Sequence, residues 1–252
     1  RPGSAAMTDT FVQTSIARRL MARMEATHQR ARISVFSGPP GIGKTTAIDA
    51  WRRRHPEHVA VVKIDRRNAG EVISLQNCLY AFRDLAKSTV THMPRARWEL
   101  RRQIFKSICA ISALDPLRVR MFGLEGAEPK PVTVVFDEAQ NLSRAAIDVL
   151  RYWSDTDRCY APHPIGLVFV GNNEFALASS KGHESAISAA VADRALYIQT
   201  FQYDELTDTD LAMVVQARGI TDPAAAAALV NAFSGPRAVR SLRRVTDLID
   251  EI

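Results

Sequence analysis

The stretch SGPPGIGKTT, residues 37–46, decides the fold that the sequence predicts for this chain of 252 residues. It follows an apolar, β-branched run at residues 33–36 and precedes a run with helical spacing, so a glycine-rich turn joins a strand to a helix. Such glycines let backbone N–H groups converge on a phosphate at a helix N-terminus, and Lys44 would reach the β- and γ-phosphates. The stretch matches the Walker A pattern and predicts binding of ATP, with the Thr45 hydroxyl as a ligand of Mg²⁺. The residues predicted to contact the nucleotide are Gly38, Pro39, Pro40, Gly41, Ile42, Gly43, Lys44, Thr45 and Thr46.

The run VTVVFDEAQ, residues 132–140, supplies the second half of the predicted site. Its apolar strand delivers Asp137 to the carboxyl edge of a sheet, where the carboxylate can hold Mg²⁺ through water. Glu138 comes next and is placed to orient and deprotonate the attacking water. Together the two motifs predict a Mg²⁺-dependent ATPase that converts ATP to ADP and phosphate, rather than a protein that only binds the nucleotide.

Four further residues are candidates for contacts with the nucleotide. Asn172 follows the fourth predicted strand, where its amide would bridge the γ-phosphate and the attacking water; the alternative is an Asx turn. Arg194 precedes the fifth strand, where it would reach a neighbouring subunit's γ-phosphate as an arginine finger, or else form a surface ion pair with Asp193 or another acid. Arg237 and Arg240, near the start of the last predicted helix, are both candidates for a lid arginine, and the sequence does not choose between them.

The order of apolar runs predicts the fold class. Strands are expected at residues 33–36, 59–64, 132–136, 165–170 and 195–199, and they alternate with helices at 11–30, 46–54, 71–88 and 95–110. Continuous apolar strands that alternate with helices indicate a parallel sheet covered on both faces, here an α/β P-loop NTPase fold. After Tyr203 only helices are expected, at 207–218, 222–233 and 236–250. We therefore expect an expression scar at residues 1–6, a nucleotide-binding α/β domain at 7–204 and a small helical lid at 205–252.

The composition favours a globular protein without a membrane-spanning helix. Apolar residues make up 46% of the chain and charged residues 24%, and no apolar run approaches the roughly 18 residues that a spanning helix needs. Three widely spaced cysteines, at 78, 109 and 159, form no CxxC pair and indicate neither a disulfide framework nor a zinc site. We expect a cytoplasmic protein.

The net charge of +6 is unevenly distributed. Residues 1–131 carry 23 Lys and Arg against 11 Asp and Glu, whereas residues 132–252 carry 10 against 16. A basic half suits a polyanion such as nucleic acid, although each single arginine is more simply explained as a solvated side chain on a helix face.

The motifs described above follow one another in the order found in AAA+ ATPases, which this chain therefore resembles. They are Walker A, the AspGlu pair, the strand-end Asn172, Arg194 and an arginine in a helical lid. More narrowly, FVQT (11–14), LVFVGN (167–172), ADRA (192–195) and RAVRSL (237–242) are similar to the transposition ATPases related to DNA transposition protein B of bacteriophage Mu. This resemblance implies ATP-dependent binding to double-stranded DNA without sequence preference, assembly into a homo-oligomeric ring or filament, and recruitment or activation of a transposase in DNA transposition and recombination. It implies no membrane partner.

The resemblance also suggests where DNA would bind. The Mu protein has a separate N-terminal DNA-binding domain, whereas FVQT follows Met7 here almost at once, so we expect the ATPase core itself to hold the DNA. Arg66 and Arg67 lie in the turn after the second predicted strand, where relatives place their DNA contacts. A reserve site is the helix with arginines at 95, 97, 101 and 102. The alternative is that Arg66 and Arg67 only solvate a loop.

Two other functions fit the same motifs. A helicase-loader-type AAA+ ATPase would also bind DNA but would remodel a ring helicase, and we expect it to need a partner-binding N-terminal extension. A nucleotide switch in signalling or secretion would scarcely hydrolyse ATP and would not bind DNA. A DNA-binding titration with and without ATP separates the last possibility from the others.

Overall fold

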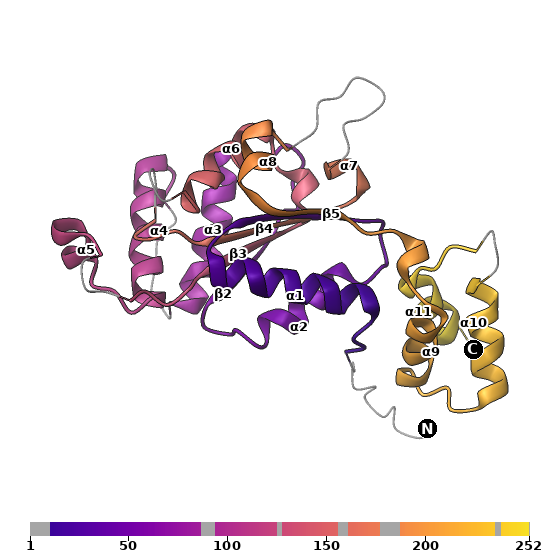
Figure 1. Cartoon of the computed structure of the whole chain (residues 1–252). Helices are drawn as coiled ribbons and strands as arrows, with labels where there is room; N and C mark the ends of the chain where they lie inside the picture. The colour runs from indigo at the N-terminus through magenta and orange to yellow at the C-terminus, as the bar shows by residue number, and fades with distance from the viewer. Residues whose placement is uncertain are drawn as a thin grey trace, which may run out of the picture. The chain divides into compact units, whose positions relative to one another are not determined.

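The structure is a computed structural model that describes residues 11–86, 94–124, 128–155, 161–176, 187–234 and 238–251 (Figure 1). Its chain divides into two compact units. The first unit comprises the described residues of Arg1–Met21, Gly38–Ala50 and Phe201–Ile252. The second unit comprises those of Ala22–Ser37 and Trp51–Thr200. The helices predicted for the lid thus belong to the same unit as the Walker A stretch.

A parallel sheet of five strands forms the centre of the second unit. The strands are β1 Ile33–Ser37, β2 Val59–Lys63, β3 Thr133–Asp137, β4 Gly166–Gly171 and β5 Ala195–Thr200. Neighbouring strands lie in the order β2-β3-β4-β1-β5, and every pairing is parallel. The predicted α/β fold with a parallel sheet is confirmed, and each strand lies within one or two residues of its predicted range.

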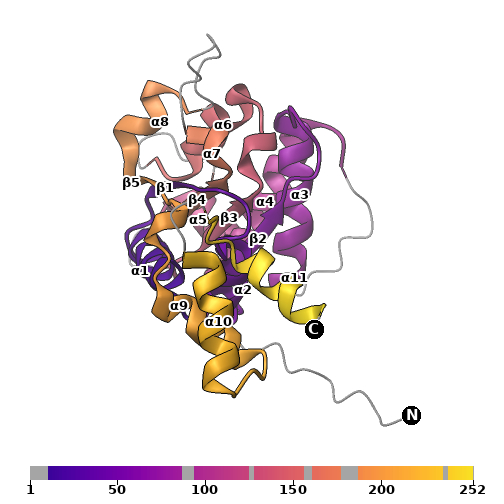
Figure 2. The ribbon, with the colours of Figure 1, turned by 90° about the vertical axis from the view of Figure 1, so that its right-hand side faces the viewer.

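Helices cover both faces of this sheet. Alternate residues of a strand point to opposite faces, so each strand contributes side chains to both. Val134 and Phe136 of β3 belong to a buried cluster that also includes residues of α3 Glu71–Leu85 and α4 Arg97–Ile111. Thr133 points the other way, and its hydroxyl bonds to Nδ1 of His28, in α1 Ser15–Arg30, at 2.9 Å. Accordingly α3 and α4 lie on one side of the sheet and α1 on the other (Figure 2). Ile16, Leu20 and Met24 form an apolar stripe along α1 and are fully buried.

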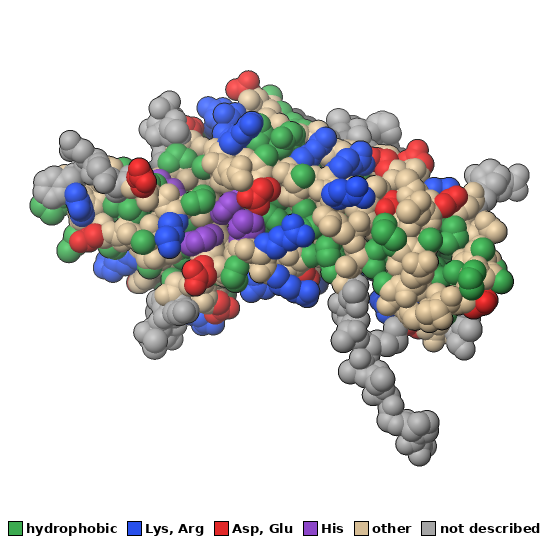
Figure 3. Space-filling model, turned by 60° about the horizontal axis from the view of Figure 1, so that its bottom comes forward, with side chains coloured by type: hydrophobic (Ala, Val, Ile, Leu, Met, Phe, Trp, Pro, Cys, Tyr) green, Lys and Arg blue, Asp and Glu red, His purple; other side chains and the backbone are tan. Residues whose placement is uncertain are grey.

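Polar and aromatic contacts attach the second half of α1 to residues 51–55. The Glu25 carboxylate accepts hydrogen bonds from Trp51 Nε1 at 3.0 Å and His55 Nε2 at 2.8 Å. His28 packs beside His55, with ring centroids 4.9 Å apart, and histidine side chains gather at one place on this face (Figure 3). Burial of His28, together with the nearby His55, lowers its pKa to about 4, so this imidazole is neutral at pH 7.

The remaining elements of the second unit are α5 Pro116–Phe122, the 3₁₀ turns η1 Ala139–Asn141 and η2 Arg151–Trp153, α6 Arg144–Leu150, α7 Asn173–Ala176 and α8 Ala189–Arg194. Helix α5 was not among the helices expected from the sequence. Asp115 caps it, because the carboxylate accepts the Leu117 N–H at 2.8 Å, and a proline suits the first helical position. Gly123, with φ of 67°, ends the helix.

Three helices of the first unit pack around their own small core. They are α9 Asp208–Ala217, α10 Pro223–Ser234 and α11 Leu242–Asp250, and η3 Tyr203–Glu205 precedes them. Leu211, Val215 and Val245 are buried between them, and Val12 from the FVQT stretch packs against this cluster. The unit also contains the start of α1 and most of α2 Lys44–Arg52.

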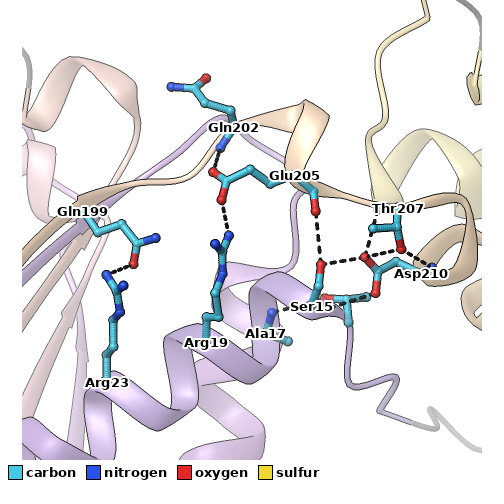
Figure 4. A network of polar contacts seen from close by, with 10 residues as sticks. Ser15, Ala17, Arg19, Arg23, Gln199, Gln202, Glu205, Thr207 and Asp210 are labelled. Carbon is cyan, nitrogen blue, oxygen red and sulfur yellow. Dashed lines mark hydrogen bonds and ion pairs between the residues drawn. The ribbon is translucent and has the colours of Figure 1, made fainter.

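A polar network joins the N-terminus of α1 to that of α9 (Figure 4). The Asp210 side chain, which is almost fully buried, accepts hydrogen bonds from Ser15 N at 2.8 Å and Ser15 Oγ at 2.6 Å, and also from Thr207. Burial alone would raise the pKa of Asp210, but the hydrogen bonds from Ser15 and Thr207 outweigh it and lower the pKa. Arg19 forms an ion pair with Glu205 in the same network. Asp210 therefore fixes residues far apart in the sequence within one unit.

Within the described residues, none of the helices is both long enough and apolar enough to cross a membrane.

Candidate nucleotide site

The Walker A stretch forms a tight loop between β1 and α2. Gly41 and Gly43 have φ of 77° and 92°, values that side-chain-bearing residues rarely adopt. Lys44 is the first residue of α2, and its ammonium group donates hydrogen bonds to the carbonyl oxygens of Gly38 at 2.7 Å and Pro39 at 2.8 Å. The loop thus ends at a helix N-terminus, where a phosphate is favourably bound.

The segment before α11 lies directly against this loop, within the first unit. Leu242 N donates a hydrogen bond to the Gly41 carbonyl oxygen at 2.8 Å. A Cβ atom on Gly41 would come within 2.3 Å of Ser241 Oγ and 3.1 Å of Arg243 Cβ, so close contact as well as backbone conformation requires glycine here. The start of α11 is therefore placed to respond to what the loop binds.

The lid arginines are arranged differently from the prediction. Arg237 lies outside the described residues. Arg240 is not in the last helix as expected, because Ser241 has extended backbone and α11 begins only at Leu242. The Arg240 guanidinium instead pairs with Asp208 at 2.9 Å and donates to the Leu206 carbonyl oxygen at 2.5 Å, which attaches it to the start of α9.

Arg243, which was not predicted from the sequence, is the arginine of this segment that lies beside the loop. It lies in the first turn of α11, it is exposed, and its Cβ is the side-chain atom next to Gly41. The run RAVRSLRR contains it three residues after Arg240, so the correct start of the helix would have pointed to it.

In the second unit, β1, β4 and β3 end in register at the carboxyl edge of the sheet. Ser37, the last residue of β1, pairs with Gly171, and Asp137, the last residue of β3, pairs with Val170. Asp137 is 4% exposed. Because Gly38 is bonded to Ser37, the loop leaves from the edge that carries Asp137. The predicted position of Asp137 at the end of its strand is confirmed.

Gln140 connects the two strand ends beside this edge. Its Nε2 donates a hydrogen bond to Glu138 Oε2 at 2.5 Å, and its Oε1 accepts the Asn172 N–H at 3.1 Å. A Cβ on Gly171 would lie 2.9 Å from that Oε1, so a side chain there would crowd the amide. The sequence analysis did not single out Gln140, because a glutamine two residues after an acid carries no signal of this contact.

Glu138 itself has an unusual backbone. Its φ of 57° and ψ of 39° lie in the left-handed region, which costs a residue with a side chain about 1–2 kcal/mol. Its N–H donates to Asp137 Oδ1 at 3.0 Å. Strained backbone of this kind gathers at functional sites, where the surroundings hold a side chain in one direction.

Asn172 adopts the turn that was considered as its alternative role. Its Oδ1 accepts the Glu174 N–H at 3.0 Å, two residues on, which defines an Asx turn at the start of α7. This bond fixes the orientation of the amide and uses its oxygen, while the Nδ2 group is the part with donors to offer a phosphate.

Arg194 is the last residue of α8 and is 41% exposed on its side chain. Its Nε lies 3.7 Å from Asp155 Oδ2, and its Nη1 donates to the Ala190 carbonyl oxygen at 3.2 Å. Asp155, rather than the neighbouring Asp193, is thus its acidic partner. A pair at this distance and exposure contributes little to stability, so the guanidinium can exchange partners at small cost.

Thr45 and Asp137 fit the ligand chemistry of Mg²⁺, since a hydroxyl and a carboxylate are hard oxygen donors. No group of three or more His, Cys, Asp and Glu residues that could hold a metal occurs in the described part of the chain.

A family model described as an AAA domain matches residues 27–177, more than half of the chain. The chain belongs to the AAA domain family. This family comprises P-loop ATPases that bind nucleotides, and the loop at residues 38–46 lies within the matched range. Comparison with curated proteins finds no match.

Two solved structures are compared with this chain. Cdc6p from Pyrobaculum aerophilum aligns with a TM-score of 0.58 and 14% identity over 97% of this chain and 63% of that one. A point mutant of RuvB from Thermotoga maritima aligns with a TM-score of 0.48 and 14% identity, over 96% and 64%. The chain thus spans somewhat less than two thirds of the length of these proteins. At 14% identity the likeness to Cdc6p shows the fold alone.

A basic turn follows β2 in the AAA domain. Arg66 and Arg67 are both exposed, and Asn68 has φ of 55°, which asparagine tolerates. The structure therefore leaves both guanidinium groups accessible, as a contact with DNA phosphates requires.

Hydrogen bonds attach this basic turn to the segment that carries Glu138. Asn141 Nδ2 donates to the Ile64 carbonyl oxygen at 2.7 Å, and Ala69 N donates to the Asn141 carbonyl oxygen at 2.8 Å. Asn141 ends the short 3₁₀ turn η1 that Glu138 precedes. One asparagine thus joins both ends of the basic turn to the end of β3.

Proposed function

We propose that this AAA domain hydrolyses ATP with Mg²⁺ and binds double-stranded DNA without sequence preference. On DNA it forms a homo-oligomer, as a ring or filament, that recruits or activates a transposase. The observation that carries the proposal is the attachment of the exposed Arg66–Arg67 turn to the Glu138 segment through Asn141. Such an attachment is expected where a DNA contact and a hydrolytic site serve one task.

In the proposed reaction each residue has one role. Lys44 binds the β- and γ-phosphates, and Thr45 and Asp137 would hold Mg²⁺, which offsets phosphate charge when bound. Glu138 accepts a proton from the attacking water, and the Asn172 amide donates to the γ-phosphate. Lid arginines, from Arg237, Arg240 and Arg243, complete the contacts to the nucleotide. The products are ADP and phosphate.

DNA binding is proposed to use phosphate contacts only. Arginines at 66 and 67 would neutralise a few phosphates per subunit, which gives weak binding at physiological salt. Several subunits bound side by side would multiply the number of contacts, so oligomerisation controls affinity. The likeness of residues 11–14, 167–172 and 192–195 to transposition ATPases supports a transposase as the partner.

The test is the affinity for an arbitrary duplex in ATP and in ADP, together with the rate of ATP hydrolysis. We expect tighter binding in ATP and a steep fall of affinity with salt. Lys44→Ala should lose nucleotide binding, and Glu138→Gln should bind ATP and DNA but lower turnover at least about 100-fold.

Equal affinity in ATP and ADP would contradict the switch. Absence of DNA binding at any salt concentration would favour a nucleotide switch in signalling or secretion instead. Full turnover by Glu138→Gln would remove Glu138 from the reaction.

A further inference from the structure

Helix α4 presents a basic stripe with a tryptophan in it. Trp98, Arg102 and Lys106 follow one another at four-residue spacing, which places them on one face of the helix, and all three are exposed. Trp98 is 65% exposed, whereas Trp51 and Trp153 are each 1% exposed. Arg95, also exposed, lies just before the helix. We call these four residues, Arg95, Trp98, Arg102 and Lys106, the α4 stripe.

The α4 stripe lies close to the basic turn at Arg66 and Arg67. Glu71, at the start of α3, forms an ion pair with Arg97 at 3.2 Å and a second one with Arg101. Three residues lie between Arg67 and Glu71, so their Cα atoms are at most about 14 Å apart. Helices α3 and α4 pack side by side (Figure 1). The reserve site of the sequence analysis and the Arg66–Arg67 turn are therefore neighbouring parts of one surface.

Within α4 the charges divide between two tasks. Arg97 and Arg101 pair with Glu71 and attach α4 to α3. Arg102 and Lys106 face solvent, and Glu99 is the only acid in the helix sequence. A large exposed aromatic ring among cations is unfavourable in water but suits a nucleic acid, where phosphates meet the cations and a base or sugar covers the ring.

We propose that the α4 stripe extends the DNA-binding surface beyond the basic turn. In this proposal Arg95, Arg102 and Lys106 contact phosphates, and Trp98 covers a nucleobase or a deoxyribose. It rests on the proposed DNA binding and assigns the stripe to that same activity. The phosphate and base chemistry is shared by duplex and single-stranded DNA, so both are used as probes.

Fluorescence of the wild-type protein tests the contact directly, because Trp98 is accessible to acrylamide and the other two tryptophans are buried. The probe is a mixed-sequence duplex about three helical turns long, added in the presence of ATP. We expect it to reduce acrylamide quenching of the tryptophan fluorescence toward the level seen in the Trp98→Phe variant. A single strand of the same sequence is the second arm. Protection by the single strand alone would identify unpaired bases as what Trp98 stacks on, and would overturn the assignment to duplex binding.

Affinity measurements give an independent readout. Trp98→Ala should weaken duplex binding about 10-fold, within the range for loss of one aromatic contact to a base. Arg102→Ala with Lys106→Ala should reduce the slope of log affinity against log salt by about 2. Leu117→Ala is the matched control, because Leu117 is 70% exposed on α5 and lies outside the stripe. The affinity of this variant for the duplex should equal that of the wild type.

The outcomes separate this inference from the proposed function. If Arg66→Ala with Arg67→Ala weakens DNA binding while Trp98→Ala and the double α4 variant do not, DNA binding stands and the α4 stripe has no part in it. If wild-type protein does not bind DNA, the proposed function and the inference both fail.

Discussion

At the scale of single residues, the arrangement around Gln140 decides how Glu138 is presented. The Gln140 amide donates to the Glu138 carboxylate at one end and accepts the Asn172 N–H at the other. A carboxylate whose one oxygen is held in this way has a fixed direction, and direction matters because a reacting group displaced by about 1 Å can lose about 100-fold in rate. We interpret Gln140 as a positioning residue for Glu138.

Gln140→Ala should therefore lower kcat for ATP hydrolysis about 10- to 100-fold and leave the affinity for ATP nearly unchanged. The physical reason is that the Glu138 side chain gains freedom while the phosphate loop is untouched. Steady-state kinetics and a nucleotide titration measure the two quantities separately. Gln140→Glu, which keeps the shape but loses the donor, should resemble the alanine variant. An unchanged or higher kcat in Gln140→Ala would show that the amide does not hold Glu138 in its working position.

The sequence predicted the positions of those residues whose type alone specifies their surroundings. Gly41 and Gly43 belong to a pattern that requires positive φ, and Asp137 follows four apolar strand residues, so their places follow from local chemistry. Gln140 and Arg243 depend instead on which segments meet in space, and no periodicity encodes that. Arg240 was misplaced because proline and arginine after a glycine resemble a helix start, whereas Ser241 is the residue with N-cap backbone.

At the scale of elements, strands were predicted better than short helices. The five strands are buried apolar runs, and a parallel sheet buried on both faces produces such runs directly. Helix α5 was not predicted because Pro116 and Gly123 are typical turn residues, yet both occupy the helix ends where they are favoured. The basic turn after β2 was predicted from the sequence. Its attachment to η1 was not, because it depends on hydrogen bonds between segments far apart in the sequence.

This attachment leads to a prediction about regulation. Asn141→Ala should reduce the stimulation of ATP hydrolysis by DNA several-fold, while basal hydrolysis and DNA affinity stay close to wild type. The reason is that the bond from Asn141 Nδ2 to the Ile64 carbonyl oxygen joins the basic turn to the Glu138 segment, and its loss leaves that buried acceptor unpaired at a cost of about 1–3 kcal/mol. The measurement is the ratio of turnover with and without duplex at saturating DNA. Arg66→Ala with Arg67→Ala is the comparison, because it should lose stimulation through lost binding. A wild-type ratio in Asn141→Ala would contradict the coupling.

At the scale of the whole molecule, the proposed mechanism needs more than one copy of the chain. The exposed Arg194 side chain pairs with Asp155 at a distance of 3.7 Å, so a neighbouring subunit's γ-phosphate would compete with this acid easily. Arginine fingers supplied by a partner contribute about 10³-fold or more to rate. If Arg194 acts in this way, no isolated subunit is a complete enzyme, and ATP both needs and stabilises the contact between subunits.

The expected result is that turnover per subunit rises with protein concentration and that Arg194→Ala lowers it about 10³-fold at high concentration. Arg30→Ala, an exposed arginine at the end of α1, is the matched control and should behave as wild type. Mixing Arg194→Ala with Glu138→Gln in equal amounts should restore about a quarter of wild-type turnover, because in a head-to-tail assembly one interface in four then joins an intact Glu138 to an intact Arg194. Chains that act alone cannot complement each other. Turnover per subunit that is independent of concentration, together with no recovery on mixing, would therefore place the whole reaction within one subunit and remove oligomerisation from the control of DNA binding.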